Sequence, residues 1–149
     1  MQRFKKISIG LLIALLMVGS ALAIVLQTRT LTHNIQIGGG DFQFYSDAGC
    51  TIVVTTVEWG SLMRGNEVSK TLYLKNIGSV TIYIDYTVAG LPSGCTLTMY
   101  FDSVPWGLVD KKMVAVGTIK QVGFYVNVGA GAVIGSTSFT TVFNGNDVA

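Results

Sequence analysis

Apolar and polar residues alternate along most of the chain, and this pattern predicts short β-strands rather than helices. Between Val80 and Val88 every second residue is Val, Ile or Tyr, and the residues between are Thr, Tyr and Asp. A period of two places one face on a core and the other towards solvent. Further strands are predicted at residues 42–45, 51–59, 68–75, 95–101, 113–118, 120–128 and 134–143. Eight short strands predict a single antiparallel β-sandwich of the jelly-roll or Ig-like kind.

Gly, Pro, Asn and Ser cluster between these runs and supply the residues that turns need. Such clusters occupy residues 60–65, 76–79, 90–94, 104–107 and 129–131. No internal repeat is visible, and residues 42–149 suit one domain with a core of its own.

The first 23 residues read as a secretory signal peptide. Arg3, Lys5 and Lys6 form a basic start, an apolar run follows, and Ala21-Leu22-Ala23 offers a small-x-small cleavage pattern. We expect cleavage after Ala23, and membrane contact only through this segment during export. The alternative is a retained membrane helix over residues 7–26, which has about the ~20 apolar residues needed to span a bilayer.

Residues 24–37 form a strand-like tail before the domain, and residues 38–41 form a Gly-rich tether. Gly38, Gly39 and Gly40 impose no chain direction and are costly in entropy to order. Two interpretations remain open. The tail is the first strand of its own sandwich, or it is a donor strand that pairs with a neighbouring subunit. In the second case the subunit interface would hold the apolar side chains of the tail together with its histidine: Ile24, Val25, Leu26, Leu31, His33, Ile35 and Ile37.

A head-to-tail contact of this kind does not close on itself, so it predicts a homopolymeric filament outside the cell. The composition after residue 23 agrees, because seven basic and eight acidic side chains leave a net charge of −1. Few charges oppose lateral contacts between filaments. No basic patch remains, and no nucleic-acid partner is expected.

Cys50 and Cys95 are the two cysteines, and in an exported chain they predict one disulfide. The chain contains one histidine, His33, so a histidine-rich metal site cannot be assembled. A Ser-His-Asp site needs a positioned imidazole, and the single candidate lies in the tail. We therefore expect no catalytic residue, no metal site, no cofactor and no enzyme activity. A membrane-anchored, monomeric surface domain that binds glycans is the alternative function, with Trp59 and Trp106 as candidate sugar-stacking platforms.

Three sequence steps carry a family resemblance. They are an aromatic-x-Asp-x-x-Cys start within "FYSDAGC", a V-x-W-G-x-L-x-x-G step within "VEWGSLMRG", and a strand that ends in "YLKNIG". Over residues 42–143 the chain resembles small exported archaeal β-sandwich proteins. Among filament-forming proteins it resembles the subunits of archaeal bundling pili, which are similar in fold to the TasA and camelysin matrix-fibre proteins of bacterial biofilms.

The resemblance implies a jelly-roll pilin that polymerises by donor-strand complementation. It also implies pili that associate laterally into bundles and support cell-cell adhesion and biofilm formation. Camelysin-like proteins have been classed as metallopeptidases. That activity is not carried over, because this chain lacks a recognisable metal-ligand set.

Overall fold

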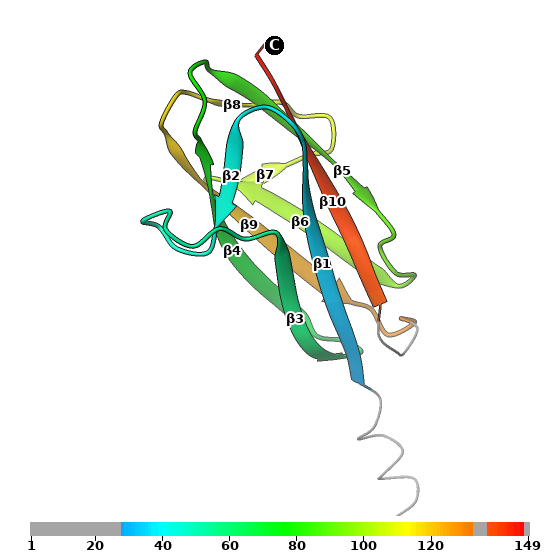
Figure 1. Cartoon of the computed structure of the whole chain (residues 1–149). Helices are drawn as coiled ribbons and strands as arrows, with labels where there is room; N and C mark the ends of the chain where they lie inside the picture. Colours follow the sequence, from blue (N-terminus) through cyan, green and yellow to red (C-terminus); the bar gives the residue numbers. More distant parts are fainter. Residues whose placement is uncertain (1–27, 133–136, 148–149) are drawn as a thin grey trace, which may run out of the picture.

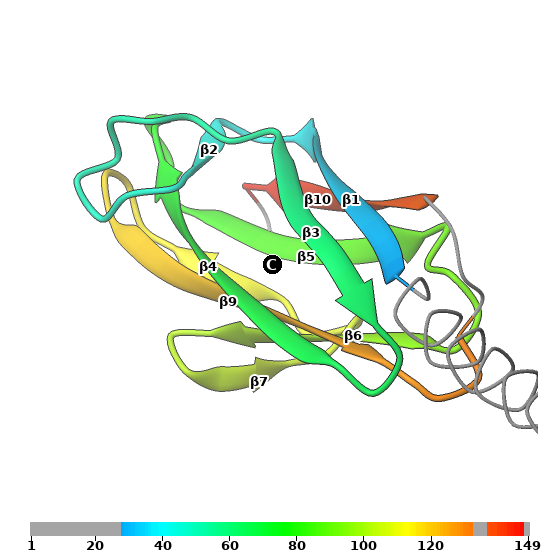
Figure 2. The same cartoon turned by 90° about the horizontal axis from the view of Figure 1, so that it is seen from below.

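The computed structural model describes residues 28–132 and 137–147, and these form two packed β-sheets (Figures 1 and 2). No helix occurs in these two ranges. The expected all-β sandwich is therefore confirmed. The ten strands are β1 (Thr28–Gly39), β2 (Phe42–Tyr45), β3 (Thr56–Met63), β4 (Glu67–Asn76), β5 (Ile82–Ala89), β6 (Cys95–Phe101), β7 (Val104–Trp106), β8 (Lys112–Val114), β9 (Ile119–Val128) and β10 (Thr137–Asn146).

One sheet, sheet A, has the order β3-β1-β10-β5-β8. β1 lies inside this sheet, antiparallel to β3 and parallel to β10. Figure 1 shows β1 and β10 side by side along the sandwich. The tail predicted from the sequence is therefore a central strand of its own domain here, as in the first of the two interpretations. Its parallel pairing with β10 is the exception in an otherwise antiparallel fold.

The other sheet, sheet B, has the order β2-β4-β9-β6-β7 and is antiparallel throughout. Figure 2 shows the two sheets as separate layers. Alternate side chains of both sheets point into the space between them and form one core. Its largest fully buried side chains include Phe44, Phe124 and Phe143, whose rings contact one another.

Most predicted strands are confirmed, and two differences have local causes. The strand expected over residues 51–59 begins only at Thr56. The Asp47 carboxylate accepts hydrogen bonds from the backbone N–H groups of Thr51 and Ile52, which ties residues 46–55 into a loop. The segment 104–107, expected to be a turn, contains the short strand β7, because Asp102 and Ser103 already form the two-residue turn before it.

Several expectations fall on residues outside the described ranges. The signal peptide, its cleavage site and the alternative membrane helix up to residue 26 are among them, as are Ile24, Val25 and Leu26. In the part of the chain that the structure describes, no helix is long and apolar enough to cross a membrane.

Candidate functional site

The candidate site is the seat of β1, the place between β3 and β10 that this strand fills. Leu31, His33 and Ile35 point inward from β1, with exposed fractions of 0%, 0% and 7%. Their partners on β10 are Thr137, Phe139 and Thr141, in that order. The predicted inward face of the tail is therefore correct for these three residues. Their side chains occupy the interior of the sandwich, so the core is incomplete without β1.

Ile37 was expected on the same face, but its side chain is 39% exposed. Ile37 keeps its register with Phe143 of β10, and the shift in pairing comes only after it, between Ile37 and Gly39. Ile37 lies beyond the part of β1 that pairs with β3, which ends at Asn34. Ile37 is thus at the rim of the seat rather than in it.

His33 is enclosed by aromatic rings. Its imidazole is stacked on Phe139 with 4.3 Å between ring centroids, meets Phe124 edge-on at 5.2 Å, and lies 6.4 Å from Trp59. A hydrogen bond of 2.8 Å joins His33 Nε2 to the Thr141 hydroxyl oxygen. Burial lowers the pKa of His33 from 6.5 to about 4, because the charged imidazolium loses its hydration. At neutral pH the ring is uncharged and behaves as part of the core.

Two ring nitrogens in this cluster, Nδ1 of His33 and Nε1 of Trp59, are buried without a hydrogen-bond partner among the described residues. A buried polar atom without a partner weakens the folded state. The seat therefore holds β1 less firmly than an all-apolar seat of the same area would. Because His33 and Thr141 are both fully buried, no solute reaches their hydrogen bond while β1 is in place.

The link from β1 to β2 is short. Gly38 and Gly39 belong to β1, so the glycines expected as a tether form a strand end and a tight turn. Gly40 has a φ of 80°, in the left-handed region that favours glycine. A Cβ added at Gly40 would lie 3.0 Å from the Cα and carbonyl oxygen of Gly145 on β10. The closed turn therefore requires glycine at position 40.

The predicted disulfide is not formed, and Cys50 and Cys95 are not bonded to each other. Cys50 lies in the loop after β2, whereas Cys95 begins β6, and both β4 and β9 lie between β2 and β6. Three steps across a sheet amount to about 14 Å. A disulfide requires Cα atoms within about 7 Å of each other.

Trp59 and Trp106 are not sugar platforms, because both are core residues with exposed fractions of 6% and 3%. The Trp106 indole N–H donates to the Asp110 carbonyl oxygen, and its own carbonyl accepts from the Tyr86 hydroxyl. Their sequence context, a tryptophan before a glycine, does not distinguish a core position from an exposed one.

Metal ligands are not gathered within the described ranges, where no group of three or more His, Cys, Asp or Glu side chains comes together.

Sequence reasoning missed Thr141, which supplies the polar contact of His33. The only sequence feature that pointed to Thr141 was a Thr at an inward position of a strand that otherwise alternates Phe with smaller residues.

No protein-family model and no curated protein matches the chain.

Proposed function

We propose that this protein is the structural subunit of an extracellular filament, in which β1 of one subunit occupies the seat between β3 and β10 of the next. The observation that carries the proposal is the position of β1. It is an interior strand of the sheet, paired with β3 on one side and β10 on the other, and its chain connection to the other strands runs through the turn at Gly40 and Asp41.

Filling the seat with β1 of another subunit costs less free energy than leaving the seat empty. Withdrawing β1 exposes Leu31 and Ile35, and each is worth about 1.5–3 kcal/mol when buried. It also leaves the facing backbone groups of β3 and β10 without partners. A copy of β1 from another subunit restores the same contacts, so exchange costs little once the hinge at Gly40 has opened.

The geometry of exchange leads to a linear polymer. β1 contains 12 residues, which span roughly 40 Å as a strand. With the hinge extended, each subunit offers its strand on one side and an empty seat elsewhere, and such a heterologous contact propagates without closing. The partner of each subunit is then a second copy of the same chain. Location outside the cell is part of the proposal and is supported by the signal-like pattern of residues 1–23.

Lateral association of the filaments, with adhesion and biofilm formation as its result, is part of the same proposal. It is supported by the low charge of the chain, in which 12% of residues are Asp, Glu, Lys or Arg. It is also supported by exposed apolar side chains on loops and edges, such as Ile52 (60%) and Val109 (92%). Surfaces of this kind repel one another weakly and have apolar area to bury.

A cysteine pair across β1 and β3 tests which subunit provides the strand. Thr32 and Glu58 face each other in register, and the Thr32 hydroxyl donates to the Glu58 carboxylate over 3.1 Å. Directly opposed residues of an antiparallel pair are about 4.5–5.5 Å apart at Cα, which suits a disulfide. Thr32→Cys with Glu58→Cys is built in a background where Cys50→Ser and Cys95→Ala remove the native thiols.

The expected result is a ladder of covalent oligomers in non-reducing electrophoresis of oxidised, polymerised protein. The matched control is Thr87→Cys with Val142→Cys, an opposed pair on β5 and β10 that lies within one subunit in either state. It should run as a monomer. If the Thr32–Glu58 variant also runs only as a monomer in samples that contain filaments, the donor-strand assignment is wrong.

A further inference from the structure

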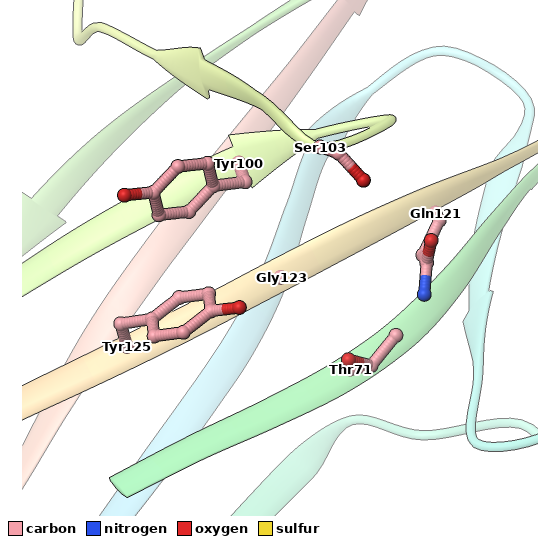
Figure 3. Close-up of a pocket in the computed structure, with 6 residues that line it drawn as sticks. All are labelled: Thr71, Tyr100, Ser103, Gln121, Gly123 and Tyr125. Carbon is pink, nitrogen blue, oxygen red and sulfur yellow. The ribbon is translucent and has the colours of Figure 1, made fainter. Parts of the chain in front are cut away.

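The outer face of sheet B carries a hollow of about 270 Å³ that opens to solvent. It is separate from the seat of β1, which lies in sheet A. The volume of the hollow is slightly below the ~300–1,000 Å³ typical of small-molecule sites. Figure 3 shows the lining residues, which come from β4, β6, β9 and the turn after β6: Thr71, Tyr100, Ser103, Gln121, Gly123 and Tyr125.

Gly123 makes the hollow. It lies between Thr71 of β4 and Tyr100 of β6, directly opposite both. Alternation along β9 directs Gln121, Gly123 and Tyr125 outward, while the intervening Val122 and Phe124 are fully buried. The missing side chain at Gly123 therefore leaves a gap in an outward-facing row, and a Cβ there would lie 3.1 Å from the Tyr125 ring.

Two tyrosine rings form one side of the hollow. Tyr100 and Tyr125 lie with ring centroids 4.9 Å apart and an interplanar angle of 65°. Tyr125 is 40% exposed. Figure 3 shows the Tyr125 hydroxyl directed along β9 past Gly123, whereas the Tyr100 hydroxyl points the opposite way. Exposed tyrosine rings give a rigid apolar contact surface at low cost in side-chain entropy.

The other side is polar and unused by the protein. Within the described ranges, the side chains of Thr71, Ser103 and Gln121 make no hydrogen bond to another protein group. Ser103 is held at the rim by a turn in which it and Asp102 have φ values of 68° and 48°. Non-glycine residues rarely adopt this conformation. The Asp102 carboxylate fixes the turn by accepting from Lys120 Nζ at 2.7 Å and from the Gln121 backbone N–H at 3.0 Å.

No charged side chain lines the hollow, and the nearby Asp102 is already paired with Lys120. An anionic ligand would find no cation there, and a cationic ligand would find no free carboxylate. A sugar ring matches what is present, because its C–H face packs on an aromatic ring and its hydroxyls exchange hydrogen bonds with hydroxyl and amide groups.

We propose that this hollow binds a neutral sugar unit of a polysaccharide, with Tyr125 as the stacking surface and Gln121, Thr71 and Ser103 as hydrogen-bonding groups. The inference goes beyond assembly, since the site is complete within one subunit. In a filament the site would repeat once per subunit. Weak single-sugar contacts would then add up through multivalency to firm attachment along a polysaccharide chain.

The test measures retention of the purified, full-length exported protein on beads that carry covalently immobilised mannan, β-glucan, α-glucan or chitin oligomers. Bare beads and beads carrying dextran sulfate serve as blanks. We expect retention on at least one neutral polysaccharide and little loss of it when salt is raised. Tyr125→Ala and Gln121→Ala should each weaken that retention by about tenfold or more.

Tyr83→Ala is the matched control, because Tyr83 faces outward from β5 on the opposite sheet and should leave retention unchanged. Melting curves of the variants verify that each is folded, and Gln121→Ala carries the test if Tyr125→Ala is not. The proposal is overturned if the wild-type protein is retained on no neutral polysaccharide, or if both site variants bind as well as it does. It is also overturned if Tyr125→Ala only disperses filament bundles, since the face would then be a contact between copies.

Discussion

The imidazole Nε2 of His33 lies 2.8 Å from the hydroxyl oxygen of Thr141, and this hydrogen bond is buried between the parallel strands β1 and β10. It joins two residues that are 108 positions apart in the sequence. Protonation of the imidazole places a charge in a site where Phe139, Phe124 and Trp59 surround the ring. The seat of β1 is therefore sensitive to acid.

The first prediction concerns pH. The folded-state pKa of His33, about 4, lies below its ordinary value of 6.5, so between these values the unfolded chain binds a proton that the folded chain does not. The contribution of the neutral His33 to the free energy of unfolding is fully present above pH 6.5 and is lost as the pH falls towards 4. The free energy of unfolding should drop by up to about 3 kcal/mol over this range. Urea unfolding at a series of pH values measures it.

The control for the pH prediction is His33→Phe combined with Thr141→Val, which removes the titrating group and its polar partner together. Carboxylates with lowered pKa values, such as Asp47, titrate in both proteins and cancel in the comparison. The difference in stability between the two proteins should change with pH between 6.5 and 4. A difference that stays constant over this range would show that His33 does not titrate as the buried site requires.

The second prediction concerns the strand itself. Removal of residues 24–37 takes Leu31, His33 and Ile35 out of the core, and we expect a destabilised protein that forms no filaments. A synthetic peptide of residues 28–39, added to this truncated protein, should occupy the empty seat and raise the melting temperature of the truncated protein by several degrees. The same peptide with Ile35→Asp should fail, because it would bury an unpaired carboxylate. Normal fibres from the truncated protein would rule out the proposed assembly.

The third prediction concerns the hinge. Gly40→Ala places a Cβ at a φ of 80° and 3.0 Å from Gly145, which costs the closed turn about 1–2 kcal/mol or more. An extended hinge carries no such cost, so the substitution should favour strand exchange. We expect the ratio of polymer to monomer to rise by about tenfold for each ~1.4 kcal/mol of strain. Sedimentation at fixed protein concentration measures that ratio.

Gly117→Ala is the control for the hinge, since Gly117 has a φ of 69° and nothing within 4 Å of an added Cβ. It lies between β8 and β9, away from the turn at Gly40. The strain it introduces is present in both states, so stability should fall while the ratio of polymer to monomer stays the same. A lower polymer fraction for Gly40→Ala than for Gly117→Ala would contradict the exchange mechanism.

The fourth prediction concerns Asn76, a fully buried polar residue at the end of β4. Its side-chain Nδ2 donates to the backbone carbonyl oxygens of Val80 and Val114, and its side-chain Oδ1 accepts from the Gly78 backbone N–H. Since Val114 belongs to sheet A, the side chain links the two sheets. Asn76→Ala should lower the free energy of unfolding by about 2–4 kcal/mol in urea titrations.

Asn127→Ala provides the comparison, because Asn127 is an exposed strand residue and its loss should cost no more than about 0.5 kcal/mol. Equal effects of the two substitutions would mean that Asn76 does not act as a link between the sheets.

Alternation was sufficient to predict the strands with one buried face. Ile82, Ile84 and Tyr86 are buried as the pattern of β5 requires, and β2 and β6 have the predicted bounds. It failed where a side chain overrides propensity. The β-branched run 51–55 forms a loop because Asp47 captures its backbone N–H groups, and the effect of one carboxylate is not visible in a hydrophobic pattern.

The site was predicted only in part. The inward face of the tail followed from its period of two, but its place beside β10 did not, since pairing between distant segments leaves no local signal. The hydrogen bond between His33 and Thr141 was missed for the same reason. The hollow on sheet B was also missed, because Gly123 matters only through its neighbours Thr71 and Tyr100 on other strands.

The parallel pairing of β1 with β10 also sets an order in time. A ribosome makes β1 first and β10 last, and the 108 residues that separate His33 from Thr141 take roughly 5–20 s to synthesise. During that interval β1 is complete while one wall of its seat does not yet exist. Of all the strands, β1 thus spends the longest time before its partner β10 has been made. This interval gives a newly made chain time to meet another molecule before β1 pairs within its own domain.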